Sequence, residues 1–269
     1  MGSRAGQRSK PEARGRQKLT CLLFVICHLI SSLCPKCCAY AVRMAALLQL
    51  VLAGAFAARS GWFVERADSG ERIASFNAHM LGMILAWLAM TEGVLAWATW
   101  ERGAGLSHAN TKTAHAGFNL LGIAFATWGL VSIFRNHAVK GIPPLYSAHS
   151  WLGVFAVSMV ALAALGGVAC FLLGNLLGIS AEVRKAMLPW HRMAAVMGYF
   201  AGLLAMLMGI QEKQGWTDCA DGGARCTDKT LLGLMALATA ALGAAVAARL
   251  AADSEAKRRD AKESKRLLA

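Results

Sequence analysis

Long apolar stretches dominate the chain, and polar or charged residues separate them. Five have about the 20 residues that a helix needs to cross the hydrocarbon core of a bilayer. They lie near 78–99, 113–134, 148–178, 187–210 and 230–252, and a sixth, weaker stretch near 41–58 has Arg43 at its start. Only helices and closed barrels satisfy their backbone in lipid, and runs this rich in Ala and Leu favour helices. The pattern predicts an all-α integral membrane six-helix bundle.

Composition narrows the class of protein further. Of the 269 residues, 57% are hydrophobic and 16% are charged, and the mean hydropathy is +0.46. A soluble domain has about 25% charged and about 45–50% apolar residues. Intrinsic disorder is excluded by the large apolar content. Eight cysteines are too few for a small secreted disulfide scaffold.

Three segments are expected along the chain. Residues 1–40 form a basic N-terminal tail with an extra apolar piece, 41–252 the six-span domain, and 253–269 a charged cytoplasmic tail. The apolar piece at 19–33 follows basic residues, as in a signal sequence. A segment that dips into the membrane and an artefact of gene prediction are the alternatives.

The net charge of +13 is concentrated in the two tails. Residues 1–18 and 253–269 carry six Lys or Arg each. This distribution indicates charge at a cytoplasmic membrane face rather than a nucleic-acid partner, and both termini are then expected in the cytoplasm. The loop at 212–229 would lie outside, where Cys219 and Cys226 can pair in an oxidising compartment.

Histidines lie at the ends of the predicted spans. His79 and His149 begin the second and fourth spans, and His115 and His191 begin the third and fifth. Successive spans run antiparallel, so His79 and His149 should lie at one depth near the outside. His115 and His191 should lie at another depth near the inside. His137 ends the third span, ~33 Å along the helix from His115.

Two histidine pairs at two depths in a four-helix core suit two haems stacked across a membrane. Two imidazoles fill both axial positions of a haem iron, which favours electron transfer over oxygen chemistry. The alternatives are histidines that merely anchor helices at the interface, and a zinc or proton pathway. A zinc or proton pathway needs acidic partners, but the core spans offer only Glu92, ~20 Å from His79 along the helix.

At these histidines the sequence resembles the cytochrome b561 family, over roughly residues 42–250. The matching motifs are FNAHMLGMILAWLAMTEG (76–93), KTAH (112–115), FRNH (134–137), IPPLYSAHSWLG (142–153), LPWHRMAAVMGY (188–199) and MGIQEK (208–213). The chain departs from the family pattern at Met80, Asn119 and Pro144, but no departure removes one of the four paired histidines.

The resemblance implies two haem b groups per chain. His115 and His191 would ligate the inner haem, and His79 and His149 the outer haem. Ascorbate on the cytoplasmic side would donate single electrons, and monodehydroascorbate or a ferric chelate on the opposite side would accept them. The family also suggests a homodimer. The plasma membrane and an endomembrane such as the endosome, vacuole or lysosome fit equally.

Candidate substrate residues lie at both ends of the core. Ascorbate is an anion near neutral pH, so cations beside the inner haem are candidates for binding it: Lys112, Arg184, Lys185 and Arg192. His137, Tyr146 and Ser147 are the candidates on the acceptor side. The structural alternatives are topology-setting charge for the cations, interfacial anchoring for Tyr146 and helix capping for Ser147.

Two other functions stay open. One is a dedicated ferric-chelate reductase, which can share the same mechanism. The other is a non-redox membrane protein, such as a transporter, sensor or scaffold, that uses the same bundle.

Overall fold

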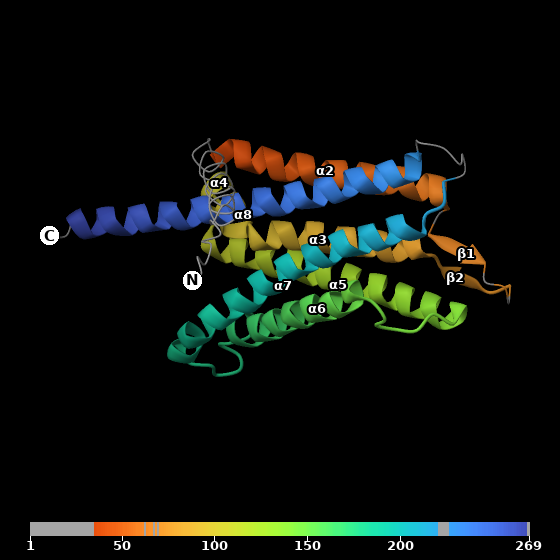
Figure 1. The fold of residues 1–269 in the computed structure, drawn as a ribbon. Coiled ribbons are helices and arrows are strands. Elements are labelled where there is room, and N and C mark those ends of the chain that lie inside the picture. Colours follow the sequence, from red (N-terminus) through yellow and green to blue (C-terminus); the bar gives the residue numbers. More distant parts are fainter. Residues whose placement is uncertain (1–34, 62, 67, 69, 220–225, 268–269) are drawn as a thin grey trace, which may run out of the picture.

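The computed structural model describes residues 35–61, 63–66, 68, 70–219 and 226–267. The prediction for the apolar piece at 19–33, and for everything before residue 35, lies outside the described residues. In the described part, helices run back and forth along one axis and form an elongated bundle (Figure 1). The helices are α2 (Pro35–Ser60), α3 (Phe76–Val94), α4 (Arg102–Ala104), α5 (His108–Lys140), α6 (Ala148–Gly167), α7 (Ala181–Trp216) and α8 (Thr227–Leu267), with π-helical turns η1 (Trp97–Glu101) and η2 (Val168–Leu172).

The prediction of an all-α membrane bundle is confirmed. Five of the helices are long and apolar enough to cross a membrane, and a sixth span results if α3 and the bent segment after it are counted together. The stretch near 41–58, which has the weakest apolar signal in the sequence, forms the continuous helix α2. The break instead falls in the second predicted span, where α3 and the helix at 97–104 meet at 54°.

The bundle is built from three helix pairs. Helix α3 packs along α5, α6 along α7, and α2 along α8. Small residues set the approach within the pairs: a Cβ at Gly82 of α3 would lie 2.8 Å from the Cα of Gly129 on α5, and one at Gly198 of α7 would lie 2.9 Å from the main-chain nitrogen of Val160 on α6. Lipid tails are as apolar as the helix side chains, so the hydrophobic effect does not drive membrane helices together. They associate instead by close packing, which small residues at the interface allow.

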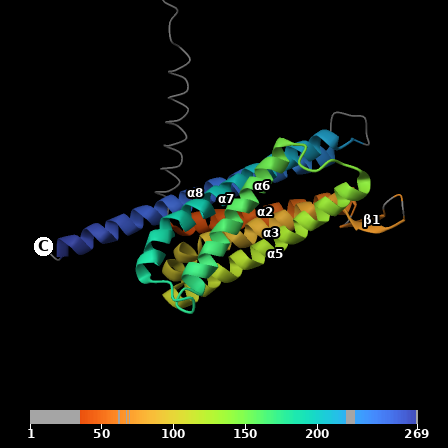
Figure 2. The same cartoon turned by 90° about the horizontal axis from the view of Figure 1, so that it is seen from below.

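A short antiparallel hairpin lies at one end of the bundle, which we call the hairpin end. Strands β1 (Val64–Arg66) and β2 (Arg72–Ala74) pair with Glu65 opposite Ile73. The predicted loop between the first two spans contains these strands. Figures 1 and 2 show the hairpin beyond the ends of α2 and α3.

At the opposite end, which we call the tail end, α8 continues past the other helices (Figure 2). It runs to Leu267 without a break at 252, so the described part of the charged segment predicted at 253–269 extends the last span as a helix. Likewise α2 begins at Pro35, inside the segment predicted as the N-terminal tail. The domain boundaries at 40 and 252 stay predictions.

Candidate functional site

Four histidines occupy equivalent places in the α3–α5 and α6–α7 pairs. Each Nδ1 lies within hydrogen-bond distance of a main-chain carbonyl on the other helix of its pair: His79 to Gly129 (3.0 Å), His115 to Gly93 (2.7 Å), His149 to Ala205 (2.8 Å) and His191 to Ala163 (2.9 Å). A carbonyl can only accept, so the proton sits on Nδ1. Each Nε2 therefore keeps a lone pair for a metal ion.

The four helices repeat one spacing. Each accepting carbonyl belongs to the residue fourteen positions after the histidine on its own helix: Gly93 after His79, Gly129 after His115, Ala163 after His149, and Ala205 after His191. Within each pair, each helix therefore accepts a hydrogen bond from the histidine of the other helix. The two histidines of a pair lie at two different levels along the bundle. Fourteen helical residues correspond to ~21 Å, which is the separation of the two levels along the bundle.

The histidines of the two helix pairs meet across the core. The ring centroids of His79 and His149 are 6.3 Å apart, and those of His115 and His191 are 6.2 Å apart. An imidazole nitrogen binds a metal ion at about 2 Å, so two rings that hold one ion between their Nε2 atoms have centroids roughly 6 Å apart. The structure thus brings His79 close to His149 and His115 close to His191, which are the pairs expected from the direction of the spans.

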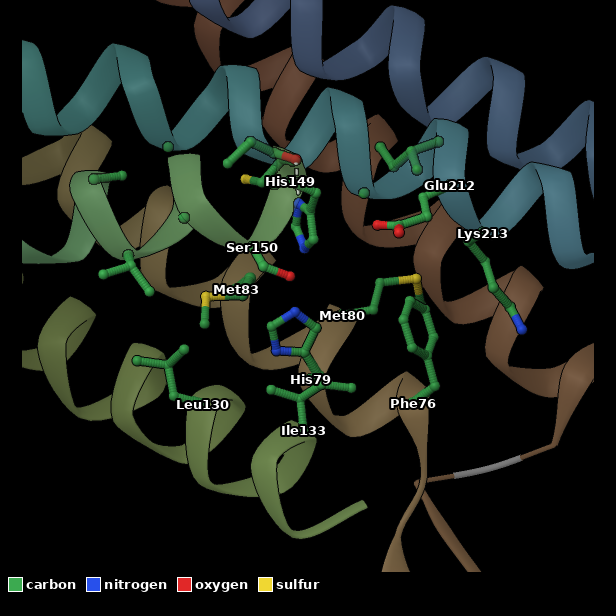
Figure 3. Close-up of a pocket in the computed structure, with 18 of the residues that line it drawn as sticks. Phe76, His79, Met80, Met83, Leu130, Ile133, His149, Ser150, Glu212 and Lys213 are labelled. Atoms are coloured by element: carbon green, nitrogen blue, oxygen red, sulfur yellow. Dashed lines mark hydrogen bonds between the residues drawn. The ribbon is translucent and has the colours of Figure 1, made fainter. Parts of the chain in front are cut away.

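Glycines leave room beside two of the rings. A Cβ at Gly209 would lie 2.7 Å from the ring of His149, and one at Gly167 would lie 3.0 Å from the ring of His191. An apolar cavity surrounds the His79–His149 pair, and its space of about 1240 Å³ includes a part open to solvent. Figure 3 shows both rings directed into it from α3 and α6. Among the described residues, no group of three or more His, Cys, Asp or Glu lies close enough together to hold a metal ion.

Polar side chains gather around the part of this cavity that lies at the hairpin end. Glu212 accepts a hydrogen bond from Ser147 (3.2 Å) and lies beside Lys213 in the lining (Figure 3). Tyr146 lies between the ring of His137 (6.2 Å between centroids) and that of Trp216 (6.3 Å). The three predicted acceptor-side residues therefore lie together.

The turn before α6 positions Tyr146 and Ser147. Leu145 adopts a φ of 54°, a left-handed conformation that non-glycine residues rarely take and that is often found at functional sites. Ser147 caps α6: its side chain accepts a hydrogen bond from the main-chain N–H of Ser150, as expected if Ser147 serves as a helix cap. Burial, and then the Glu212 carboxylate that accepts its hydrogen bond, raises the pKa of Tyr146 to about 12. The phenol thus keeps its proton at neutral pH.

Sequence reasoning missed Glu212, Lys213 and Trp216 as parts of this site. The loop expected at 212–229 begins later, because α7 continues to Trp216 and carries these residues along the cavity. The MGIQEK motif at 208–213 was the available signal, since its last two residues are Glu212 and Lys213.

The four predicted ascorbate-side cations are spread over the tail end. Lys112 is half-buried on α5, one turn before His115, and Arg184 on α7 donates to Asn175. Lys185 and Arg192 are exposed on α7, and Arg192 lies within electrostatic range of Lys257 on α8. The structure does not gather the four into one cluster.

Aromatic rings flank the tail-end histidine pair. Trp97, in the π-helical turn after α3, lies 4.6 Å from the His115 ring between centroids, and Phe171, in the second π-helical turn, lies 5.4 Å from that of His191. Such turns are frequent at functional sites. The sequence predicted continuous spans at both places and so missed them.

Comparison of the sequence with known proteins identifies a family. The model of the family described as "Eukaryotic cytochrome b561" matches residues 78–217, a stretch that contains all four paired histidines. The probable ascorbate-specific transmembrane electron transporter 2 of Oryza sativa subsp. japonica is 28% identical over 77% of this chain and 84% of its own length.

Two animal proteins are also similar. The plasma membrane ascorbate-dependent reductase CYBRD1 of Xenopus laevis is 32% identical over 57% of this chain and 50% of its own length. The transmembrane ascorbate-dependent reductase CYB561 of Bos taurus is 26% identical over 66% of this chain and 68% of its own. The family match covers more than half of the chain and includes both helix pairs of the site. This integral, multi-pass membrane protein therefore belongs to the cytochrome b561 family.

Proposed function

We propose that this protein carries single electrons from cytoplasmic ascorbate, through two haem b groups, to an acceptor on the other side of the membrane. The observation that carries the proposal is the pair of facing imidazoles, repeated at two levels of one bundle. A cytochrome b561 implies haem b. The similar plant and animal proteins named for ascorbate-dependent electron transport or reduction support ascorbate as the donor.

The chain's own residues fit the group. His79 and His149 would hold one haem and His115 and His191 the other, each through the Nε2 that its carbonyl bond leaves available. A haem held by two imidazoles would supply one-electron transfer rather than oxygen chemistry. The apolar lining around His79 and His149 would keep water from the group and set its potential.

At the hairpin end, the acceptor would be monodehydroascorbate or a ferric chelate. His137 and Tyr146 line the cavity at the hairpin end, and Ser147 adjoins Tyr146; Glu212 accepts hydrogen bonds from Tyr146 and Ser147. The Tyr146 hydroxyl gives its one hydrogen to Glu212, so the rings of Tyr146 and His137 would provide the contact surface for the acceptor, and Lys213 supplies positive charge in the same lining. Their position next to the outer histidine pair supports an acceptor site there.

At the tail end, positive charge would hold the ascorbate anion. Lys112 is the favoured candidate because it is half-buried one turn from His115, whereas Arg184 is already bonded to Asn175. Lys185 and Arg192 are the remaining candidates. The homodimer and the particular membrane stay predictions.

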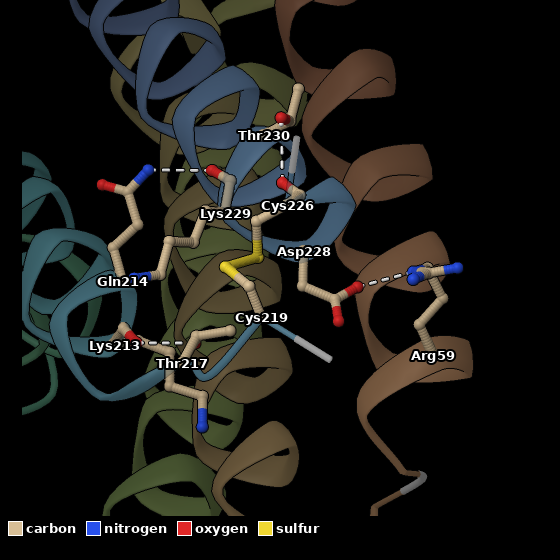
Figure 4. The surroundings of a disulfide bond; sticks show 9 residues. All are labelled: Arg59, Lys213, Gln214, Thr217, Cys219, Cys226, Asp228, Lys229 and Thr230. Atoms are coloured by element: carbon tan, nitrogen blue, oxygen red, sulfur yellow. Dashed lines mark hydrogen bonds and ion pairs between the residues drawn. A yellow bond between two sulfur atoms is a disulfide. The ribbon is translucent and has the colours of Figure 1, made fainter. Parts of the chain in front are cut away.

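The disulfide between Cys219 and Cys226 supports the orientation. It joins the start of α8 to the segment after α7 at the hairpin end (Figure 4). Disulfides persist in extracellular or lumenal compartments and are rare in the cytosol. We therefore propose that the hairpin end faces away from the cytoplasm and that both termini are cytoplasmic.

Titration of the purified full-length protein with ascorbate tests the function. We expect two haems per chain, with a sharp reduced band in the green part of the spectrum and reduction in steps. A full-length protein purified with no haem, or with haem that ascorbate cannot reduce, would leave the fold intact and overturn the proposed function.

A further inference from the structure

Two large aromatic side chains fill the core between the two histidine levels. Trp87 is 2% exposed and Tyr199 is 1% exposed. Trp87 lies eight residues after His79 on α3, and Tyr199 lies eight residues after His191 on α7. Each is ~12 Å along its helix from that histidine, and α3 and α7 begin at opposite ends of the bundle. Both rings therefore lie near the middle of the ~21 Å that separates the two levels.

Hydrogen bonds connect this pair to the rest of the core. The Trp87 indole N–H donates to the main-chain carbonyl of Tyr199 at 2.8 Å. The Tyr199 hydroxyl lies 2.7 Å from the Thr91 hydroxyl, which itself donates to the Trp87 carbonyl at 2.8 Å. Since Thr91 has one hydrogen to give, Tyr199 is the donor in the shared bond.

The same contacts link the two levels. Trp87 lines the inner end of the cavity around His79 and His149. Thr91 lies two residues before Gly93, whose carbonyl accepts from His115. A series of hydrogen-bonded and covalently joined groups thus leads from the His115–His191 level to Trp87, which faces the cavity around the other histidine pair.

Gly202 makes room for the indole. A Cβ at Gly202 on α7 would overlap the six-membered ring of Trp87, so the indole lies directly against the α7 backbone. A side chain held this closely, with its one polar atom bonded, has a single position. The indole ring of Trp87 therefore keeps a fixed position between the two histidine levels.

We propose that Trp87, held by Tyr199 and Gly202, is the main tunnelling medium for the electron that moves between the inner and outer haem sites. The inference rests on the proposed function. One electron leaves the inner site and enters the outer site, while Trp87 and Tyr199 keep all their electrons and protons. Tunnelling falls off more slowly through bonded and closely packed atoms than across voids, so the aromatic ring raises the coupling between the sites.

Substitution of Trp87 tests the proposal in the full-length protein with both haems bound. One electron is injected by a laser flash from a soluble photoreductant, and its equilibration between the two haem absorption bands is followed. We expect Trp87→Leu to slow this equilibration severalfold and Trp87→Phe, which keeps a ring, to slow it less. Haem content, both midpoint potentials and the melting temperature are measured for every variant.

Trp128→Leu is the matched control. Trp128 lies on α5 and is 41% exposed, so its loss should leave the equilibration rate unchanged. An unchanged rate in Trp87→Leu with two haems bound would overturn the proposal, as would a slower rate accompanied by a shifted midpoint potential. If Trp87→Leu does not fold, the same criteria apply to Trp87→Phe. Absence of haem from the unsubstituted protein would refute the proposed function instead, so the two failures are distinguishable.

Discussion

The four paired histidines owe their ring orientation to main-chain carbonyls rather than to side chains. A second hydrogen bond of this kind typically contributes about 10–100-fold to the metal affinity of a site. No side-chain substitution removes a carbonyl, but any change in the α3–α5 or α6–α7 contact moves it. Histidine geometry here therefore depends on the small residues that set helix approach, such as Gly82 and Gly129.

Replacing His149 should remove one haem and spare the other. His149→Ala deletes an imidazole from the hairpin-end pair, whereas the His115–His191 pair lies ~21 Å away along the bundle. We expect the haem content per chain to fall from two to one, measured by pyridine haemochrome absorbance against protein concentration.

His108→Ala is the control for that variant. His108 is exposed and its Nδ1 lies 3.1 Å from Glu101, outside both histidine pairs, so two haems should remain. Two full haems per chain in His149→Ala would contradict the assignment of ligands.

At the scale of elements, the hairpin packs against the end of α5 that carries His137. Asn136 is 3% exposed, and its amide donates to the Glu65 carboxylate at 2.6 Å and to the Ala74 carbonyl at 2.9 Å. Lys140 pairs with Glu65 as well, at 2.8 Å, and Arg135 pairs with Glu71. The hairpin thus fixes the last turns of α5 next to the acceptor-side cavity.

Asn136→Ala should loosen this attachment. The substitution leaves the part-buried Ala74 carbonyl without this donor, and loss of a donor to a buried acceptor typically costs about 1–3 kcal/mol. We expect a lower melting temperature and faster amide hydrogen exchange in β2. Asn110→Ala, at an exposed position near the start of α5, should change neither. Equal exchange in the two variants would show that the hairpin does not depend on Asn136.

The sequence predicted the long elements well because a membrane span leaves a strong apolar signal. It predicted the grouping of His79 with His149 because span direction fixes depth. It missed β1 and β2 because strands of three residues are too short for an alternating pattern. It placed Glu212 in a loop because polar residues usually end a span, whereas α7 continues past the apolar stretch to Trp216. Side-chain hydrogen bonds such as Trp87 to Tyr199 carry no sequence pattern.

For the whole molecule, the disulfide distinguishes one end of the bundle chemically. Cys219 and Cys226 are seven residues apart, a loop whose closure typically adds about 2 kcal/mol of stability. Cys170, in the second π-helical turn, is free and buried.

A membrane-impermeant reductant should therefore report orientation. Added to sealed vesicles, it should free Cys219 and Cys226 for thiol labelling only when the face opposite the C-terminal tail is outside. Peptide mapping identifies the labelled residues, and a Cys219→Ser/Cys226→Ser variant gives the background. Labelling from the same side as the tail would reverse the proposed orientation.

The fourteen-residue spacing has a consequence for how such a carrier is driven. Within each pair, two antiparallel helices carry the same histidine-to-carbonyl spacing, so a half-turn about an axis across the bundle exchanges one histidine level with the other. A histidine frame with that symmetry does not by itself favour electron flow in one direction. Net flow in one direction then depends on the differing chemistry at its two mouths and on the concentrations of donor and acceptor there.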